Sequence, residues 1–435
     1  MEPSSRETLK EWVIDVQRRT LQLLEGLSGD QLIGPQLPTV NPLRWEIGHS
    51  AWFMEKFVLR EAMGRKPLLS NGDDLFDSIA IEHGERWNLP LPSFAKTLQY
   101  VGDVHDAVAE RLETAELTDK AVDLIKLSVF HEDMHTEAFT YTRQTLSYPA
   151  PFPVEVESSD AVSDPRSAGQ DVPVPGGEFM LGAARDEPFV FDNEKWAHPV
   201  ELNPFVVAKC AVTQGRFAEF TDDGGYERPE LWSDEGWNWR RTEGATHPIY
   251  WRKELGGDWS RRDFDRWIPL ESHRAMVHVC WHEANAFCRW AKRRLPTETE
   301  WEAAAASSRE NGSLSADKRR YPWGDDAPNP SRANLDWKAM GTIDATACPR
   351  GDSAMGCRQM IGNVWEWTAT DFAPHPGFVV GPYKEFSTTG FGFRKTLRGG
   401  CWATRGRMLR NTLRNFYQPC RRDVPAGFRT CALEP

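Results

Sequence analysis

The 435-residue sequence has no run of roughly 18 apolar residues, the length that a helix needs to cross a bilayer. We therefore expect no membrane-spanning helix and no membrane partner. The first residues, MEPSSRETLKEW, lack the apolar stretch of a secretory signal, so a cytoplasmic location is expected. The net charge is −12 and no basic stripe is present, which argues against nucleic acid as a partner.

Cysteine pairs of the C-x-x-C type are also absent. The eight cysteines are scattered between positions 210 and 431, and no two are separated by only two residues. In a reducing cytosol such cysteines remain thiols. We therefore expect most of them to be free.

The apolar pattern divides the chain into two parts. Residues 6 to about 148 repeat apolar positions with a helical period and predict four helices. These run from about 6, from Pro42 to Gly64, over about 93–115, and over 119–146. Four helices with polar connections predict an antiparallel bundle over 1–148.

The remainder has a different texture. Residues 149–172 are rich in Pro, Ser and Asp and predict a linker. Residues 173–435 mix short strands, two amphipathic helices and many Gly and Pro breaks. The predicted fold class is α+β, with a helical bundle followed by a domain of strands and loops.

HEDMH, at 131–135, is the most informative motif. Inside a predicted helix, His131 and His135 lie four residues apart, so they project from one face and can bind one metal ion. The motif also matches H-E-x-x-H, in which Glu132 would be the general base of a zinc protease. No third-ligand motif follows it, so that alternative is disfavoured, and Glu132 is expected behind the ligands or on the helix surface.

Several later phrases resemble a known fold. They resemble the sulfatase-modifying-factor domain, also called the formylglycine-generating-enzyme type, which is C-type-lectin-like. The phrases are RLPTETEWEAAA (294–305), YPWGDD (321–326), IGNVWEWT (361–368), LRGGCW (397–402) and AGFRTC (426–431). The N-terminal part resembles the DinB-type four-helix bundle. Joined in this order, the two resemble the iron-dependent sulfoxide synthases of ergothioneine biosynthesis.

This resemblance implies a metal centre. In the family, Fe(II) is held by one histidine from an early helix and two from H-x-x-x-H. The matching residues are His49, in NPLRWEIGHSAW, with His131 and His135. The implied substrates are hercynine (N-trimethyl histidine), a sulfur or selenium nucleophile, and O2. Neutral imidazoles suit Fe(II), and three ligands leave coordination positions open.

The resemblance also assigns residues to catalysis and to hercynine. Tyr383 matches a tyrosine that donates a proton during oxygen reduction, which needs an O–H that stays protonated until then. Phe386 lies where some relatives have a second tyrosine. Asn415 and Phe416, within RNFYQPCRRDVPAGFR, match residues that contact hercynine, whose quaternary ammonium suits an aromatic face. Met134 replaces a glutamine of some relatives.

A further group of residues bears on the nucleophile. Arg86 and Arg421 match arginines that bind carboxylates of the thiol substrate. Tyr417 or Gln418 lies where users of γ-glutamylcysteine have an acid, and His83 lies where they have a second arginine. Because both changes remove charge complementarity, we expect the co-substrate to differ from γ-glutamylcysteine.

Two nucleophiles remain. Free cysteine is used by one branch of the family. The phrases HEDMHTEAFTYTRQTL, CRQMIGNVWEW, RGGCWAT and RNFYQPCRRDV resemble most the selenoneine synthase branch, in which a selenosugar replaces the thiol. We favour the selenosugar, with a sulfoxide synthase that uses cysteine or γ-glutamylcysteine as the alternative.

Two other classes stay open at this point. Formylglycine-generating relatives oxidise a protein cysteine with copper held by two cysteines, for which Cys401 and Cys420 are the candidates. Those relatives lack the bundle and its histidines. Some proteins of lectin-like fold only bind ligands. Metal content separates the classes, since iron, copper, zinc or no metal would each indicate a different one.

Overall fold

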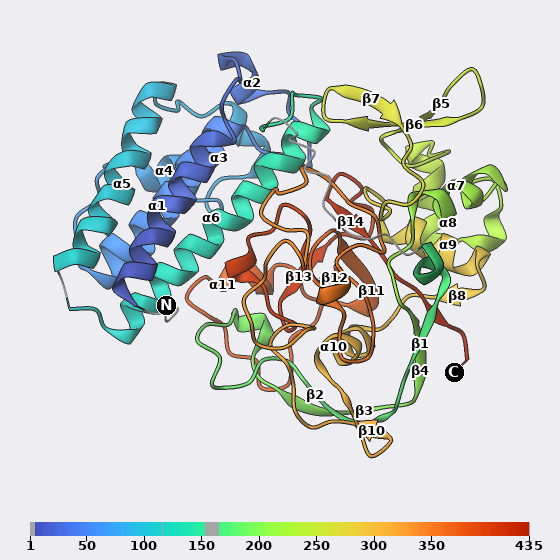
Figure 1. Cartoon of the computed structure of the whole chain (residues 1–435). Coiled ribbons are helices and arrows are strands. Elements are labelled where there is room, and N and C mark those ends of the chain that lie inside the picture. The colour runs from blue at the N-terminus through green and yellow to red at the C-terminus, as the bar shows by residue number, and fades with distance from the viewer. Residues whose placement is uncertain (1–4, 115, 153–164, 435) are drawn as a thin grey trace. The chain divides into compact units, whose positions relative to one another are not determined.

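A computed structural model describes residues 5–114, 116–152 and 165–434 (Figure 1). The chain divides into two compact units, Met1–Pro153 and Val154–Pro435. Residues 153–164 of the expected linker lie outside the described residues, while a 3-10 turn (Pro165–Gly169) and the start of β1 occupy its end.

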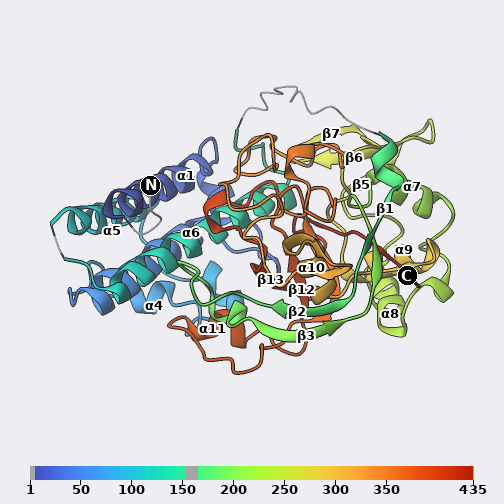
Figure 2. The same ribbon diagram turned by 60° about the horizontal axis from the view of Figure 1, so that its bottom comes forward.

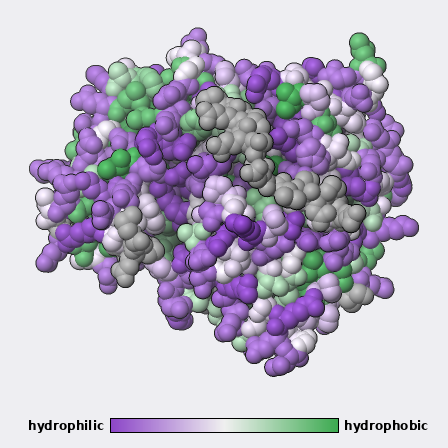
Figure 3. Space-filling view, in the orientation of Figure 1, coloured by the Kyte–Doolittle hydropathy of each residue, from purple (hydrophilic) through white to green (hydrophobic). Residues whose placement is uncertain are grey.

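Among the described residues, no helix is both long and apolar enough to cross a membrane. The face seen in Figure 3 is mostly hydrophilic, with small separated hydrophobic areas.

The first unit is helical. Its long helices lie side by side as a bundle in Figure 1, and they confirm the four helices predicted from periodicity. The elements are α1 (Arg6–Gln22), α2 (Gly29–Ile33), α3 (Leu43–Met54), η1 (Glu55–Ala62), α4 (Gly72–Phe76), η2 (His83–Trp87), α5 (Phe94–Thr114) and α6 (Asp119–Thr145).

Local residues set the ends of these helices. Ser5 caps α1 by accepting a hydrogen bond from the Thr8 N–H at 3.2 Å, and Thr118 caps α6 through the Ala121 N–H at 3.2 Å. Such caps satisfy backbone donors that the first turn leaves open. Helix α6 is buried along most of its length, as expected for the helix at the centre of a bundle.

The helix predicted from Pro42 to Gly64 changes type in its second half. After α3 the chain continues as η1, a π-helix. Within η1, buried Glu55 accepts hydrogen bonds from the Leu68 N–H at 2.6 Å and from the Tyr100 hydroxyl. Stretches of π-helix are rare in proteins, and those that do occur often lie near functional sites. This one directly follows the helix that carries His49.

The second unit has an α+β fold. Its helices are α7 (Gln214–Asp222), α8 (Asp234–Glu243), α9 (Trp281–Trp290), α10 (Glu298–Ala306) and α11 (Lys384–Thr388). Its strands are β1 (Asp171–Val174), β2 (Gly177–Leu181), β3 (His198–Leu202), β4 (Phe205–Ala208), β5 (Trp251–Lys253), β6 (Trp259–Asp263), β7 (Arg266–Pro269), β8 (Arg293–Arg294), β9 (Arg309–Glu310), β10 (Ser313–Leu314), β11 (Trp365–Asp371), β12 (Lys395–Arg398), β13 (Arg414–Tyr417), β14 (Ala426–Gly427) and β15 (Cys431–Ala432).

These strands form several small sheets. One has the order β1-β4-β15-β8, one β13-β12-β11-β14, and one β5-β6-β7. Strands β2 and β3 form a long antiparallel ribbon, seen at the lower edge of Figure 2. In the second sheet β13 pairs with β12 and, among the described strands, lies at the edge of the sheet.

The phrases that carried the resemblance build the interior of this unit. In TETEWE, Glu298 and Glu302 lie one turn apart on α10 and face Arg398 of LRGG, at 2.9 and 2.5 Å. Glu366 of GNVWEW binds Arg429 of AGFR through both carboxylate oxygens, at 2.6 and 2.8 Å. All five side chains are nearly inaccessible. Paired, hydrogen-bonded charges can be buried in this way, whereas single charges cannot.

This network predicts an acid-sensitive contribution to stability. Burial alone would raise the pKa of Glu302, but Lys318 and Arg398 outweigh it and lower the pKa from 4.5 to about 2. Because the folded pKa is depressed, the stabilisation is present above pH 4.5 and is lost as the pH falls toward 2. We expect Glu302→Gln to lower the free energy of unfolding at pH 7 by about 3–5 kcal/mol.

Denaturant unfolding of wild type and variant between pH 7 and 3.5 measures this effect. The difference in unfolding free energy should shrink below pH 4.5, where the wild-type carboxylate begins to lose its advantage. Glu201→Gln, at an exposed position of β3, is the matched control and should change little. A difference that is constant across this range would contradict the role given to Glu302.

Candidate metal centre and substrate-binding residues

Three histidine side chains converge in the first unit. His49 comes from α3, and His131 and His135 come from successive turns of α6. One nitrogen from each lies within 4.8 Å of the others, and this is the one such group of three or more metal-binding side chains in the described parts of the chain. The Nε2 atoms of His131 and His135 are 3.3 Å apart. His49 and His131 are each 2% exposed.

Hydrogen bonds orient two of the rings. The Nδ1–H of His49 donates to the Phe76 carbonyl at 2.8 Å, and the Nδ1–H of His135 donates to Glu46 Oε1 at 2.7 Å. With the proton on Nδ1, Nε2 is left as the ligand atom, an arrangement common in metal sites. The Phe53 ring stacks on His131 with centroids 3.7 Å apart. These contacts fix the rings in place.

The surroundings keep the imidazoles neutral. Burial, followed by the nearby His135, lowers the pKa of His49 well below 6.5. Burial, followed by His135 and His49, does the same for the pKa of His131. Metal ligation needs the neutral ring, so this environment favours it at neutral pH.

The donor set fits ferrous iron. It consists of three imidazole nitrogens without a thiolate, and imidazole suits Fe(II) as well as other first-row metals. A closed structural zinc site would have four protein ligands, whereas three leave positions for substrates. The geometry therefore supports a catalytic rather than a structural metal.

Glu132 points away from this centre. Its two carboxylate oxygens accept hydrogen bonds from the Thr20 hydroxyl at 2.7 Å and from His105 Nε2–H at 2.8 Å. His105 in turn binds the Val101 carbonyl through Nδ1–H at 2.8 Å. All three polar side chains are 1% exposed. A zinc-protease base must face the metal-bound water, so this geometry is incompatible with that alternative.

Arg86 supports the centre from outside. Its guanidinium donates to Asn41 Oδ1 at 2.7 Å and to the Ser78 carbonyl at 3.1 Å. It also lies over the Trp45 ring, 4.2 Å from the centroid, and Trp45 stacks on His49 with centroids 4.9 Å apart. The guanidinium expected to bind a substrate carboxylate is therefore bound to protein acceptors.

The two other candidates of the first unit lie at half-buried positions. His83 donates from Nε2 to the Val40 carbonyl at 2.8 Å, and its ring meets Trp87 edge-on. Met134 is half-buried on α6, between the two histidines of the motif. These positions do not by themselves assign either residue to a substrate.

The aromatic candidates of the second unit gather together. Half-buried Tyr383 directly precedes α11, with its ring centroid 6.0 Å from that of Phe386. Phe386 lies 5.5 Å from Phe416, and Phe416 stacks on Phe372 at 4.0 Å. Clustered aromatic faces of this kind suit a quaternary ammonium group.

The remaining candidates lie on and after β13. Strand alternation places Asn415 and Tyr417 on one face and Phe416 on the other. Asn415 Oδ1 accepts a hydrogen bond from the Phe416 N–H at 2.8 Å. Arg421 forms a two-pronged ion pair with Asp423, at 2.6 and 2.7 Å. The second arginine expected to bind a carboxylate is thus also paired within the protein.

The cysteines are free thiols, as expected. Cys401 is buried and its sulfur accepts a hydrogen bond from the Ala403 N–H at 3.4 Å. Cys420 is half-buried and lies 3.8 Å from Gln418 Oε1, and burial raises its pKa. These contacts give no support to a two-cysteine copper site.

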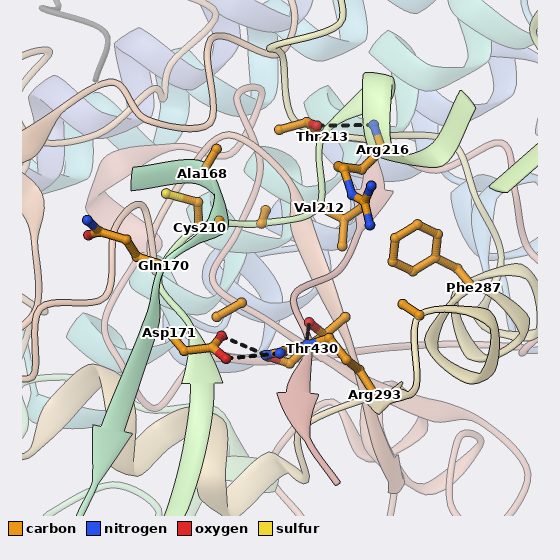
Figure 4. Close-up of a pocket in the computed structure, with 14 residues that line it drawn as sticks. Ala168, Gln170, Asp171, Cys210, Val212, Thr213, Arg216, Phe287, Arg293 and Thr430 are labelled. Carbon is orange, nitrogen blue, oxygen red and sulfur yellow. Dashed lines mark hydrogen bonds and ion pairs between the residues drawn. The ribbon is translucent and has the colours of Figure 1, made fainter. Parts of the chain in front are cut away.

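Two cavities lie apart from the predicted residues. One, of about 180 Å³, lies beside Cys210 in the second unit, where Asp171 and Thr430 bind Arg293 (Figure 4). Burial raises the pKa of Cys210 to about 11, so its thiol is protonated and unreactive at neutral pH. The other, of about 370 Å³, lies in the first unit between α4 and α5 and has Phe76 in its wall.

Residues not expected from the sequence complete the metal centre. Glu46 lies three positions before His49 on α3. A carboxylate one helical turn from a candidate ligand can be seen in the sequence and could have indicated a residue that orients the ligands. His105 gave no such signal, because its partner Glu132 lies 27 residues away. The Phe76 carbonyl is a backbone group that no side-chain pattern reveals.

Comparisons with known families match both halves of the chain. Residues 157–433 match the family described as sulfatase-modifying factor enzyme 1-like domain, and residues 14–138 match the DinB superfamily. These matches confirm the fold class predicted for the chain.

Two relatives match this chain over nearly its full length, and a third matches part of it. Hercynine oxygenase of Mycolicibacterium smegmatis is 34% identical, covering 98% of this chain and 98% of the relative. Hercynine oxygenase of Mycobacterium tuberculosis is 36% identical, covering 98% and 99%. Formylglycine-generating enzyme of Streptomyces coelicolor is 31% identical but covers 59% of this chain and 86% of its own.

Proposed function

This chain belongs to the ergothioneine-type sulfoxide synthase family, and we propose that it joins a selenium or sulfur nucleophile to the imidazole carbon of hercynine, using Fe(II) and O2. His49, His131 and His135 would hold the iron. Ferrous iron would supply the redox chemistry that couples oxygen reduction to C–Se or C–S bond formation. The convergence of these three rings is the observation that carries the proposal.

The protein's own groups have separate tasks. Glu46 and the Phe76 carbonyl hold the protons of His135 and His49 on Nδ1, so that each ring presents Nε2. Phe386 and Phe416 bind the trimethylammonium group, and fully buried Phe372 packs behind Phe416. Tyr383 donates a proton in the oxygen-dependent step.

We propose a selenosugar as the nucleophile. Arg421 is ion-paired with Asp423, and Arg86 donates to the neutral amide oxygen of Asn41, so both guanidinium groups already donate to protein acceptors. A substrate with two carboxylates would have to displace these partners, whereas a sugar needs hydroxyl-pairing and stacking groups. Free cysteine, with one carboxylate, is the alternative nucleophile.

A side-by-side assay tests the nucleophile. The iron-loaded enzyme is given hercynine and O2 with a selenosugar, cysteine or γ-glutamylcysteine, and kcat/KM is measured for each. We expect the selenosugar to be best and γ-glutamylcysteine to be about 30- to 100-fold poorer, the size of a lost charge-assisted contact. Histidine in place of hercynine is the control that tests whether the reaction requires the trimethylammonium group.

Each outcome has a distinct meaning. A higher kcat/KM with cysteine would assign the enzyme to the sulfur branch. γ-Glutamylcysteine as the best substrate would contradict the role given to the paired arginines. No product with any nucleophile, from protein that retains its iron, would overturn the proposed reaction.

A further inference from the structure

Arg394 is a half-buried arginine whose side chain meets no hydrogen-bond acceptor among the described residues. It directly precedes β12, and its guanidinium carbon lies 5.4 Å from the centroid of the Phe416 ring. Its Nε is shielded from solvent and has no hydrogen-bond partner. Within the described residues its side chain contacts the rings of Phe393 and Phe416, and no carboxylate or carbonyl oxygen. An unpaired buried donor costs free energy unless a ligand satisfies it.

The neighbouring charges leave this position with an excess of positive charge. Burial, then the positive charge of Arg421, lowers the pKa of Arg394, and the only opposing influence comes from Tyr417. Asp423 neutralises Arg421 through both carboxylate oxygens. Among the described residues, one carboxylate, that of Asp423, therefore accompanies the two guanidinium groups. This imbalance favours the binding of an anion beside Phe416.

The aromatic surroundings narrow the chemical class of that anion. Phe416, which Arg394 overlies, also packs against Phe386, and we assign these two rings to a quaternary ammonium. A betaine carries its ammonium and its carboxylate on the same carbon atom. A surface with an aromatic cluster next to an unpaired guanidinium matches both charges of such a zwitterion.

We infer that Arg394 donates hydrogen bonds to the carboxylate of the betaine substrate, an assignment that rests on the proposed function. The nucleophile that we favour has no carboxylate, so the betaine is the source of the anion. Arg421, paired to Asp423, then has a structural role beside Tyr417.

A ligand comparison tests this inference directly. Hercynine and its decarboxylated analogue, N,N,N-trimethylhistamine, are titrated calorimetrically into iron-loaded enzyme without oxygen. We expect the wild type to bind hercynine about 10- to 100-fold more tightly than the analogue, as for loss of one charge-assisted pair. Arg394→Gln should bind both ligands with nearly equal affinity, and Arg394→Lys should retain part of the preference.

Lys395→Gln is the matched control, because Lys395 pairs with Asp371 and alternates to the opposite face of β12. It should keep the wild-type preference. An unchanged preference in Arg394→Gln, or a wild type that binds both ligands equally, would overturn the inference. A KM that rises for the nucleophile while hercynine binding is unchanged would also overturn it. Failure of the wild type to bind either ligand would instead count against the proposed function.

Discussion

Replacing His49, His131 or His135 by alanine is expected to abolish turnover and most iron binding. Structural metal sites of four ligands bind with about 10–16 kcal/mol, or roughly 2.5–4 kcal/mol for each ligand. Losing one of three ligands should therefore weaken iron binding by about 100- to 1,000-fold. The rings are fixed by Phe76, Glu46 and a stacked aromatic side chain, and among the described residues no fourth metal-binding side chain joins the group to replace the lost nitrogen.

Metal analysis and turnover of the purified variants measure this effect. The wild type should contain one iron per chain, and His273→Ala, at an exposed position in the second unit, should keep both iron and activity. Full activity in any of the three ligand variants would remove the site assignment. Copper in place of iron would favour formylglycine-type chemistry, zinc a hydrolase, and absence of metal a binding protein.

Tyr383→Phe is expected to leave iron and hercynine binding intact while slowing C–Se or C–S bond formation by about 100-fold. The substitution removes one hydroxyl and keeps the ring, whose centroid lies 6.0 Å from that of Phe386. Packing should therefore be preserved. Without the proton donor, oxygen reduction should be diverted toward simple oxidation of the nucleophile to its dimer.

The ratio of coupled product to oxidised nucleophile, measured in single turnovers, tests this role. Tyr321→Phe, on a buried tyrosine that stacks on Trp323, is the matched control for removal of a hydroxyl. It should leave the ratio unchanged. An unaltered ratio in Tyr383→Phe would refute proton donation by this residue.

The helices and the convergence of the three histidines were predictable, the latter in part, for a physical reason. A 3.6-residue apolar period and two histidines four apart are local patterns, and local patterns survive in any packed bundle. They predicted one helix from about residue 6 and another over 119–146, and the structure has α1 beginning at Arg6 and α6 over Asp119–Thr145. The π-helical turns of η1 were not predicted, because the apolar pattern over 55–62 is compatible with either helix type.

Contacts between distant residues were not predictable in the same way. Whether Arg86 meets a substrate or Asn41, and whether Arg421 meets a substrate or Asp423, depends on how loops fold back on the helices and strands. No sequence motif marks Arg394. It stands out only because its Nε has no hydrogen-bond acceptor among the described residues, which a sequence cannot show. The roles of Tyr383, Asn415 and Phe416 remain predictions that the variants above address.

The hydrogen-bonded chain of Thr20, Glu132 and His105 has a consequence for how variants of the bundle behave. It joins α6 to α1 and α5 at the residue directly after His131. A helix can slide along its neighbours by one turn, about 5.4 Å, with most apolar contacts re-formed. Such a shift would strand Glu132 without partners and carry both histidines past His49. These hydrogen bonds thus fix the register of α6 against its neighbouring helices, and with it the position of His131 and His135 relative to His49.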